Sequence, residues 1–166
     1  MRLCSMISKE IKIAFEDYAT IDDLNTADRD LCLEAVKALS GSHSPYSKFR
    51  VGAAMRLQSG KIIYGSNQEN VAYPSGLCAE RVALFYWGAN HSDDPIVSIA
   101  VTAHTDSFPL LMPVTPCGSC LQVLAEYEKK QESPIEVMLY CQKGHTWKTK
   151  GVQSFLPFLF FEDRLK

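Results

Sequence analysis

The stretch PIVSIAVTAH, residues 95–104, is largely apolar and rich in β-branched residues, which predicts a strand buried on both faces of a sheet. Helical patterns lie on both sides of it, one over roughly 78–89 and one that begins near Pro116. Strand patterns stand beyond these helices, at 61–67 and 135–141. Strands that alternate with helices form a sheet with helices on its faces. The sequence therefore predicts an α/β fold, a three-layer α/β/α sandwich around a central mixed β-sheet.

Further strands extend the predicted sheet. The stretch RVGAAMRL at 50–57 alternates in polarity, and Ser59 and Gly60 join it to the strand at 61–67. Two alternating strands with a short Gly-containing turn between them predict a β-hairpin. The stretch HTWKTK at 145–150 predicts a last strand.

The N-terminal part predicts a strand and a helix. Ile11, Ile13 and Phe15 alternate with other residues, which suggests a short strand ahead of the remaining elements. Thr26 is the expected N-cap of the first helix, and Gly41 follows its last turn in the position of a C-terminal stop. We interpret residues 1–166 as one catalytic domain, in which residues 1–24 form an N-terminal extension with a possible extra strand.

Composition excludes several classes of function. With 166 residues, of which 46% are hydrophobic, the chain can bury one proper core. A net charge of -2, with no stripe of Lys or Arg, argues against a nucleic-acid partner. The longest apolar run, FLPFLFF at 155–161, is too short to span a bilayer, and the first residues lack the apolar stretch of a signal peptide. We therefore expect no membrane partner and a cytoplasmic location.

The six cysteines divide into isolated and clustered ones. Isolated cysteines are usually buried or surface thiols without chemistry. The clustered ones open the motif CAER and form the motif TPCGSC. The isolated residues are Cys4, Cys32 and Cys141, and the clustered ones are Cys78, Cys117 and Cys120.

The clustered cysteines predict a metal site. Cys117 and Cys120 are three residues apart at a helix start, so both sulfurs can point the same way. A thioredoxin-like redox pair would have the same spacing, but it has no use for Cys78. In the predicted fold the helices that begin near 78 and 116 follow strands of one sheet, so their N-termini can emerge at one edge. Three thiolates leave the fourth position of tetrahedral zinc open for water, which is the pattern of catalytic zinc.

Glu80 and Arg81 lie in the first turn beside Cys78. A carboxylate in a first turn is usually a surface charge that faces the helix macrodipole. Next to a metal, Glu80 would instead act as a general base and then a general acid. Arg81 can donate to a thiolate and, with the two helix N-termini, offset the negative charge of the sulfurs.

Three motifs together resemble the small, zinc-dependent cytidine deaminases. They are SPYSKFRVGAAM, NQENVAYPSGLCAERVALF and TPCGSCLQVLAEY, and the resemblance covers roughly residues 26 to 160. It implies the fold of that family, one Zn2+ per chain held by Cys78, Cys117 and Cys120, and a proton shuttle at Glu80. Deaminases that act on nucleic acids read H-x-E at the first motif, whereas this chain has a cysteine there.

The resemblance also implies how a nucleoside binds. Phe49 would stack on the pyrimidine, and Asn67 and Glu69 would hold the 3′-hydroxyl of the ribose. Main-chain groups around Cys78 and Ala79 would meet the carbonyl of the base. Phe160, from the C-terminal aromatic stretch, would close the pocket of a neighbouring subunit. By the same resemblance the chain is a homotetramer with pockets shared between subunits.

The activity implied is hydrolytic deamination of cytidine and deoxycytidine in pyrimidine salvage. One departure concerns Leu121, which stands where many relatives have Arg, so that Arg81 carries more of the charge compensation. Two alternatives stay open. The same chemistry can act on another aminated nucleoside, or the chain can be a non-catalytic zinc or nucleoside-binding module. A redox role for Cys117 and Cys120 is a third and weaker one.

Overall fold

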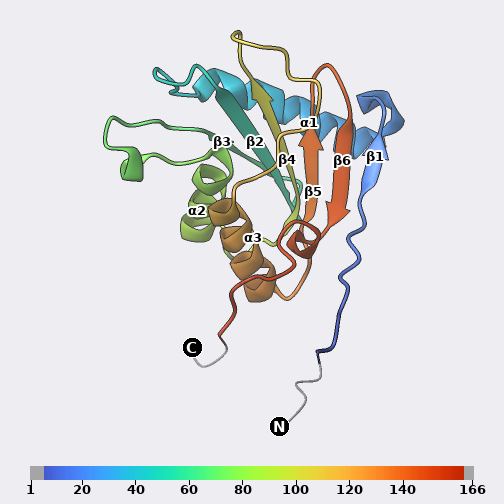
Figure 1. Cartoon of the computed structure of the whole chain (residues 1–166). Coiled ribbons are helices and arrows are strands. Elements are labelled where there is room, and N and C mark those ends of the chain that lie inside the picture. The colour runs from blue at the N-terminus through green and yellow to red at the C-terminus, as the bar shows by residue number, and fades with distance from the viewer. Residues whose placement is uncertain (1–5, 163–166) are drawn as a thin grey trace.

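One six-stranded β-sheet forms the centre of the chain (Figure 1). The computed structural model describes residues 6–162. The strand order is β1-β6-β5-β4-β2-β3, and β4 and β5 are parallel whereas the other neighbours are antiparallel. The sheet is therefore mixed, as predicted. The strands are β1 (Glu16–Tyr18), β2 (Arg50–Leu57), β3 (Ile62–Ser66), β4 (Ile96–His104), β5 (Glu136–Tyr140) and β6 (Thr146–Lys150).

Helices cover both faces of this sheet (Figure 1). Side chains of β2 alternate between two cores, because successive residues of a strand point to opposite faces. Ala54 belongs to the core under α1, whereas Ala53 and Met55 belong to the core under α2 and α3. The predicted three-layer α/β/α sandwich is confirmed. The helices are α1 (Thr26–Ala38), α2 (Ala79–Asn90) and α3 (Gly118–Gln131), and four short 3-10 turns are η1 (Ile21–Asp23), η2 (Leu39–Gly41), η3 (Tyr73–Ser75) and η4 (Val152–Ser154).

The start of α1 differs from the prediction by one residue. Asn25, not Thr26, is the N-cap, and its side chain accepts a hydrogen bond from the main-chain N–H of Asp28 at 3.0 Å. An Asn side chain satisfies a free N–H at a helix start as well as Thr does, so residue type alone does not distinguish Asn25 from Thr26 as the N-cap. The helix passes into η2, which ends at Gly41.

The predicted N-terminal strand over Ile11, Ile13 and Phe15 is wrong in its position. β1 begins at Glu16 and pairs with β6 in an antiparallel register. β6 ends at Lys150, and the chain then turns at Gly151, which has a φ of 86°. In the β1–β6 register, residues before Ala14 pass beyond the end of β6 and have no strand to pair with. A pattern of alternation cannot show how long the partner strand is.

Two glycines let the helices lie close to the sheet. A Cβ on Gly65 of β3 would meet the carbonyl oxygen of Ala79, and it would lie 2.8 Å from the main-chain nitrogen of Ala83. A Cβ on Gly52 of β2 would lie 2.9 Å from the main-chain nitrogen of Leu39. Only glycine permits such an approach of two backbones. The absence of a side chain at Gly65 therefore allows the first turn of α2 to pack directly on β3.

The described isolated cysteines are inert parts of the core. Cys32 lies on the buried face of α1 and is fully buried, and Cys141 follows β5 and is 5% exposed. Burial raises the pKa of Cys32 to about 12. Cys4 lies outside the described residues. Within residues 6–162, no helix combines the length and the apolar character needed to cross a bilayer.

Candidate metal centre and substrate pocket

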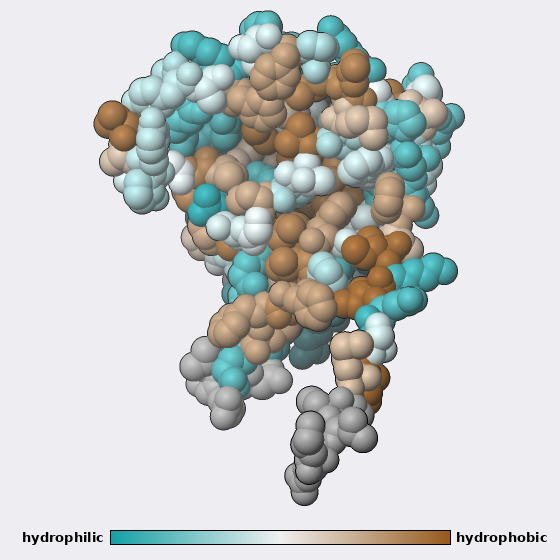
Figure 2. All heavy atoms as spheres, viewed as in Figure 1, coloured by the Kyte–Doolittle hydropathy of each residue, from teal (hydrophilic) through white to brown (hydrophobic). Residues whose placement is uncertain are grey.

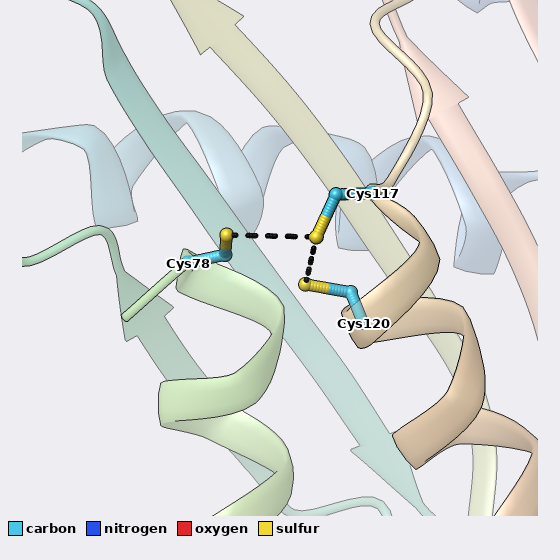
Figure 3. Close-up of side chains that lie close together, drawn as sticks. All are labelled: Cys78, Cys117 and Cys120. Atoms are coloured by element: carbon cyan, nitrogen blue, oxygen red, sulfur yellow. Dashed lines mark hydrogen bonds between the residues drawn. The ribbon is translucent and has the colours of Figure 1, made fainter. Parts of the chain in front are cut away.

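Three cysteine sulfurs lie together where α2 and α3 begin (Figure 3). Cys78 is the N-cap of α2, Cys117 is the N-cap of α3, and Cys120 lies in the first turn of α3. The Sγ atoms of Cys78 and Cys117 are 3.9 Å apart, and those of Cys117 and Cys120 are 3.5 Å apart. All three lie within 4.8 Å of one another. Residues that are far apart in the sequence thus form one cluster.

The sheet explains why the two helix starts meet. β3 and β4 both pair antiparallel with β2, so they run in the same direction and end at the same edge. α2 follows β3 and α3 follows β4, and both helices lie on one face of the sheet (Figure 1). Each helix N-terminus carries roughly half a positive charge. The sulfurs therefore lie in a positive main-chain field that favours thiolates.

The cluster fits one zinc ion. Zn–S bonds of about 2.3 Å in a tetrahedron place the sulfurs about 3.8 Å apart, close to the distances between these Sγ atoms. Thiolates are ligands that zinc prefers, and three of them leave one tetrahedral position open. Cys117 and Cys120 are free thiols. Because Cys78 completes the set, the cluster resembles a metal site more than a redox pair.

Hydrogen bonds favour the thiolate form of Cys78. The thiol of Cys120 and the guanidinium of Arg81 donate to its sulfur and lower the pKa of Cys78 to about 5. The Nη2 atom of Arg81 lies 3.8 Å from this Sγ. The interaction with Cys78, together with burial, raises the pKa of Cys120. The surrounding hydrogen bonds therefore favour a thiolate at Cys78, the form in which cysteine binds zinc.

Glu80 is buried beside the cysteines. It lies in the first turn of α2, is 4% exposed, and lines the same pocket as Cys78 and Cys117. Burial raises the pKa of Glu80, and the negative charge on Cys78 acts in the same direction. A surface carboxylate in a first turn would face water instead. A buried carboxyl with a raised pKa is suited to accept and return a proton.

A pocket of about 610 Å³ opens in front of the cluster. Its volume is in the range of sites that bind small molecules. Val51 and Val101 from the sheet, with Leu77 and Val114 from the loops before α2 and α3, give it an apolar wall. Polar side chains of the loop between β3 and α2 also line it. This combination of aliphatic and polar side chains suits a flat heterocycle that carries polar substituents.

Asn67 and Glu69 line the pocket and also hold its loops. The Oδ1 atom of Asn67 accepts the N–H of Val51 at 2.8 Å and the hydroxyl of Ser42 at 2.6 Å. Its Nδ2 atom donates to the carbonyl of Phe49 at 2.9 Å. These bonds use both ends of the Asn67 amide. The loop before β2 is therefore fixed to the loop after β3.

Glu69 accepts main-chain N–H groups of Tyr46 and Ser47, at 2.9 and 3.2 Å. Hydrogen bonds from Ser47 and Tyr46 lower the pKa of Glu69, which keeps it a carboxylate. Reasoning from the sequence did not assign any role to Tyr46 or Ser47. Both residues belong to the motif SPYSKFRVGAAM, which could have pointed to them. Their contacts with Glu69 use main-chain N–H groups, however, and any residue type except proline can provide these.

Three other predicted residues do not line this pocket. Phe49 is half-buried, and its ring stacks on that of Phe108, with centroids 6.4 Å apart and an angle of 28°. Ala79 is fully buried in the first turn of α2. Phe160 is 68% exposed. Their contacts with a nucleoside stay predictions.

Gln122 holds the main chain of Phe160. Its Nε2 atom donates to the carbonyl of Phe160 at 2.9 Å, and its Oε1 atom accepts the N–H of Phe160 at 3.2 Å. Gln122 lies on α3, two residues after Cys120. Its hydrogen bonds to the main chain of Phe160 could not be predicted from the sequence. Leu121, between these two residues, is 6% exposed and packs in the core under α2 and α3. The apolar side chain thus points into the core.

Comparisons with known proteins point to one family. Residues 25–133 match the model of the cytidine and deoxycytidylate deaminase zinc-binding region. The chain is 42% identical over 135 residues to the cytidine deaminase of Sporosarcina psychrophila, which covers 81% of this chain and 92% of that protein. It is 45% identical over 100 residues to the cytidine deaminase of Halalkalibacterium halodurans, over 60% of this chain and 71% of that protein.

A solved structure agrees with these matches. The cytidine deaminase from Burkholderia pseudomallei superposes with a TM-score of 0.67 at 36% sequence identity, over 79% of this chain and 97% of that one. The matched stretch of the family model contains all three clustered cysteines and Glu80. The chain belongs to the cytidine and deoxycytidylate deaminase family of zinc-binding proteins.

Proposed function

We propose that this chain catalyses hydrolytic deamination of cytidine and deoxycytidine to uridine and deoxyuridine, with release of ammonia. The observation that carries the proposal is the placement of buried Glu80 in the same pocket as the cluster of Cys78, Cys117 and Cys120. A structural zinc site needs four protein ligands and no proton carrier. The relatives that match are named cytidine deaminases, which supports the same activity here.

Cys78, Cys117 and Cys120 would hold one zinc ion. When bound, zinc supplies Lewis acidity that lowers the pKa of a water molecule and makes it a nucleophile at neutral pH. Glu80 would accept a proton from the water that adds to carbon 4 of the pyrimidine and would deliver it to ring nitrogen 3. It would then carry the proton of the new hydroxyl on carbon 4 to the amino group, so that ammonia leaves as the carbonyl of uridine forms. Its burial keeps the carboxyl away from bulk water, so that the protons go to the substrate.

The polar residues of the pocket would select a nucleoside. Asn67 and Glu69 would bind the 3′-hydroxyl of the ribose, and Phe49 would stack on the base. A carboxylate accepts a hydrogen bond from a free hydroxyl but repels a phosphodiester. Main-chain groups around Cys78 and Ala79 would bind the carbonyl of the base. Glu69 is already held by two main-chain N–H groups, so it is preorganised for this contact.

The charges of the pocket favour neutral substrates. The charged side chains among its described lining residues are Glu69, Glu80 and Arg81. Arg81 is directed at Cys78, so it is not available to a phosphate group. We therefore expect nucleosides to be preferred over nucleoside monophosphates.

A substrate panel tests the proposal. The purified chain is mixed with cytidine, deoxycytidine, cytidine monophosphate or free cytosine, and ultraviolet absorbance and ammonia are measured with and without a chelator. We expect turnover of the two nucleosides and its loss when the metal is removed. Zinc bound at one per chain with no turnover of any nucleoside would favour a non-catalytic module. A strong preference for the monophosphate would contradict the assignment of Glu69.

Three wider features belong to the same proposal. We place the activity in pyrimidine salvage, in the cytoplasm, and in a homotetramer in which Phe160 reaches the pocket of a neighbouring subunit. The anchoring of its main chain by Gln122, with the ring left exposed, is compatible with this role. Light scattering of the purified chain measures the assembly. Turnover of Phe160→Ala tests the aromatic contact, since a ring that only packs locally would leave turnover unchanged.

A further inference from the structure

The outer edge of β1 is open. β1 is the last strand in the order of the sheet, and it pairs with β6 on one side only. The segment that precedes it, residues 6–15, continues away from the sheet as an extended chain (Figure 1). For these residues the structure gives one hydrogen bond, from the hydroxyl of Ser154 to the carbonyl of Ala14 at 3.1 Å. An edge with free N–H and C=O groups is a template for pairing with another strand.

Apolar side chains follow this edge. Ile11, Ile13 and Phe15 are 52%, 52% and 50% exposed. Alternate residues of an extended segment point to one face, and the ring of Phe15 packs on that of Trp147, with centroids 5.2 Å apart. Figure 2 shows brown, apolar atoms beside teal ones where Figure 1 places this segment. Ile11, Ile13 and Phe15 therefore form an apolar stripe, about half of whose side-chain surface is exposed.

The direction of the main-chain groups identifies the free donors and acceptors. The carbonyl of Ala14 points to Ser154, which follows the end of β6, so it faces inward. Successive residues of an extended chain direct these groups to opposite sides. Ile13 and Phe15 would therefore direct their N–H and C=O groups to the open edge. In a pair of two identical segments, odd-numbered residues of one copy must therefore lie opposite odd-numbered residues of the other.

Charge selects one partner and one register. In an antiparallel pair of two identical segments centred on Ala14, Lys12 of each copy lies opposite Glu16 of the other. A pair centred on Ile13 would place Glu10 opposite Glu16, and one centred on Lys12 would place two lysines opposite each other. Opposite charges across a pair stabilise a sheet, whereas like charges destabilise it. Glu16 is exposed, and its carboxylate accepts a hydrogen bond from the hydroxyl of Tyr18 at 2.7 Å.

We infer that the open edge of β1 docks a second copy of this chain, through antiparallel pairing of residues 10–18 about a two-fold axis at Ala14. The two sheets then become continuous. Ile13 of each copy lies opposite Phe15 of the other, which covers the apolar stripe on one face. Two Lys12–Glu16 ion pairs lie on the other face. This surface is independent of the deaminase pocket, which lies at the starts of α2 and α3.

Charge reversal in the full-length chain tests the pairing. Lys12→Glu places two carboxylates at each contact, and Glu16→Lys places two ammonium groups there. We expect each variant alone to show a lower assembly mass than the unmodified chain in light scattering. A mixture of the two variants restores both ion pairs and should regain the full mass. If neither reversal lowers the mass, or if the mixture stays at the lower mass, the inference is wrong.

A cross-link provides a second measurement. Residues at the axis of a non-hydrogen-bonded pair have Cα atoms about 4.5 Å apart, which a disulfide can span. With Cys4 replaced by Ser, Ala14→Cys should form a disulfide-linked dimer under air, seen on a non-reducing gel. The matched control is Ser8→Cys, because two copies of residue 8 would lie about 40 Å apart along the strands. Equal dimer yields from both variants would contradict the register. Nucleoside turnover of all these variants should equal that of the unmodified chain.

Discussion

Cys78 and Cys117 occupy equivalent positions, since each is the N-cap of its helix, and their Sγ atoms lie 3.9 Å apart. Both residues have extended backbones, with φ and ψ of -70° and 155° for Cys78 and of -72° and 162° for Cys117. An N-cap side chain projects ahead of the helix rather than along its side. The two sulfurs therefore face each other in front of two helix N-termini. The metal site depends on how the sheet places α2 against α3.

Removing one sulfur should abolish stable metal binding. Cys117 is exposed, so Cys117→Ala leaves the core intact. Two cysteine ligands hold zinc far less tightly than three, and we expect zinc content to fall from one per chain to a small fraction. Elemental analysis after dialysis measures it, and circular dichroism reports the fold. Cys141→Ala, a buried cysteine outside the cluster, is the control and should keep its zinc. Full zinc content in Cys117→Ala would disprove the ligand assignment.

Glu80→Gln separates metal binding from proton transfer. Gln has nearly the same shape as Glu but cannot accept the proton from water. We expect unchanged zinc content and a loss of turnover of roughly 10²–10⁴-fold, the usual contribution of a general base. Steady-state rates on cytidine provide the measurement. Glu126→Gln changes an exposed carboxylate of α3 and should keep full activity. A Glu80→Gln variant with normal turnover would refute the assigned role.

Arg81→Gln tests the hydrogen bond to Cys78. The guanidinium offsets the charge of three thiolates, and hydrogen bonds to charged groups are worth about 1.5–3 kcal/mol. The affinity for zinc should fall roughly tenfold to a hundredfold, as measured by competition with a chelator. Arg81→Lys keeps the charge but loses the fork of donors, so its affinity should be intermediate. Equal affinities for all three chains would mean that Arg81 does not stabilise the site.

The sequence was sufficient to predict a mixed sheet covered by helices and the convergence of the cysteines. Both follow from local signals, because the alternation of strands and helices and the two cysteine motifs are visible without tertiary contacts. The strand over Ile11 and Ile13 was misplaced, since the end of β6 decides where pairing stops. The stacking of Phe49 on Phe108 was invisible for a similar reason. It depends on a loop that alternation and spacing do not describe.

Gly65→Ala should disturb the metal site from a distance. A Cβ there would meet the carbonyl oxygen of Ala79, which is backbone and cannot rotate away. Overpacking of this kind costs about 1–3 kcal/mol, and it would displace the first turn of α2 with Cys78. We expect lower stability in urea and weaker zinc binding together. Gly118→Ala is a matched control beside Cys117, because a Cβ there has no described atom within 4 Å. A stable Gly65→Ala chain with normal zinc affinity would contradict this account.

A buried ion cluster fastens α1 to the sheet. Asp28 is 2% exposed, and its carboxylate accepts Nη2 of Arg56 at 3.1 Å and Nζ of Lys148 at 2.7 Å. Burial opposes ionisation of this carboxyl, but the hydrogen bonds from Lys148 and Arg56 prevail and lower the pKa of Asp28. A group whose pKa is lower in the folded state adds stability above its unfolded pKa of about 3.9, and that stability is lost as the pH falls through the folded value.

Asp28→Asn should therefore destabilise the chain in a pH-dependent way. At neutral pH the variant removes one carboxylate from Arg56 and Lys148, which are partly buried, while Lys148 keeps its ion pair with Glu136. The loss of hydrogen bonds to a charged group costs about 1.5–3 kcal/mol of unfolding free energy. As the pH falls below about 3.9, the carboxylate of the unmodified chain becomes protonated and the difference between the two chains should shrink. Urea denaturation at several pH values measures this difference. Asp22→Asn changes a side chain that is 81% exposed, and it should have little effect at any pH. A difference between Asp28→Asn and the unmodified chain that stays constant with pH would show that the charge of Asp28 contributes nothing to folding.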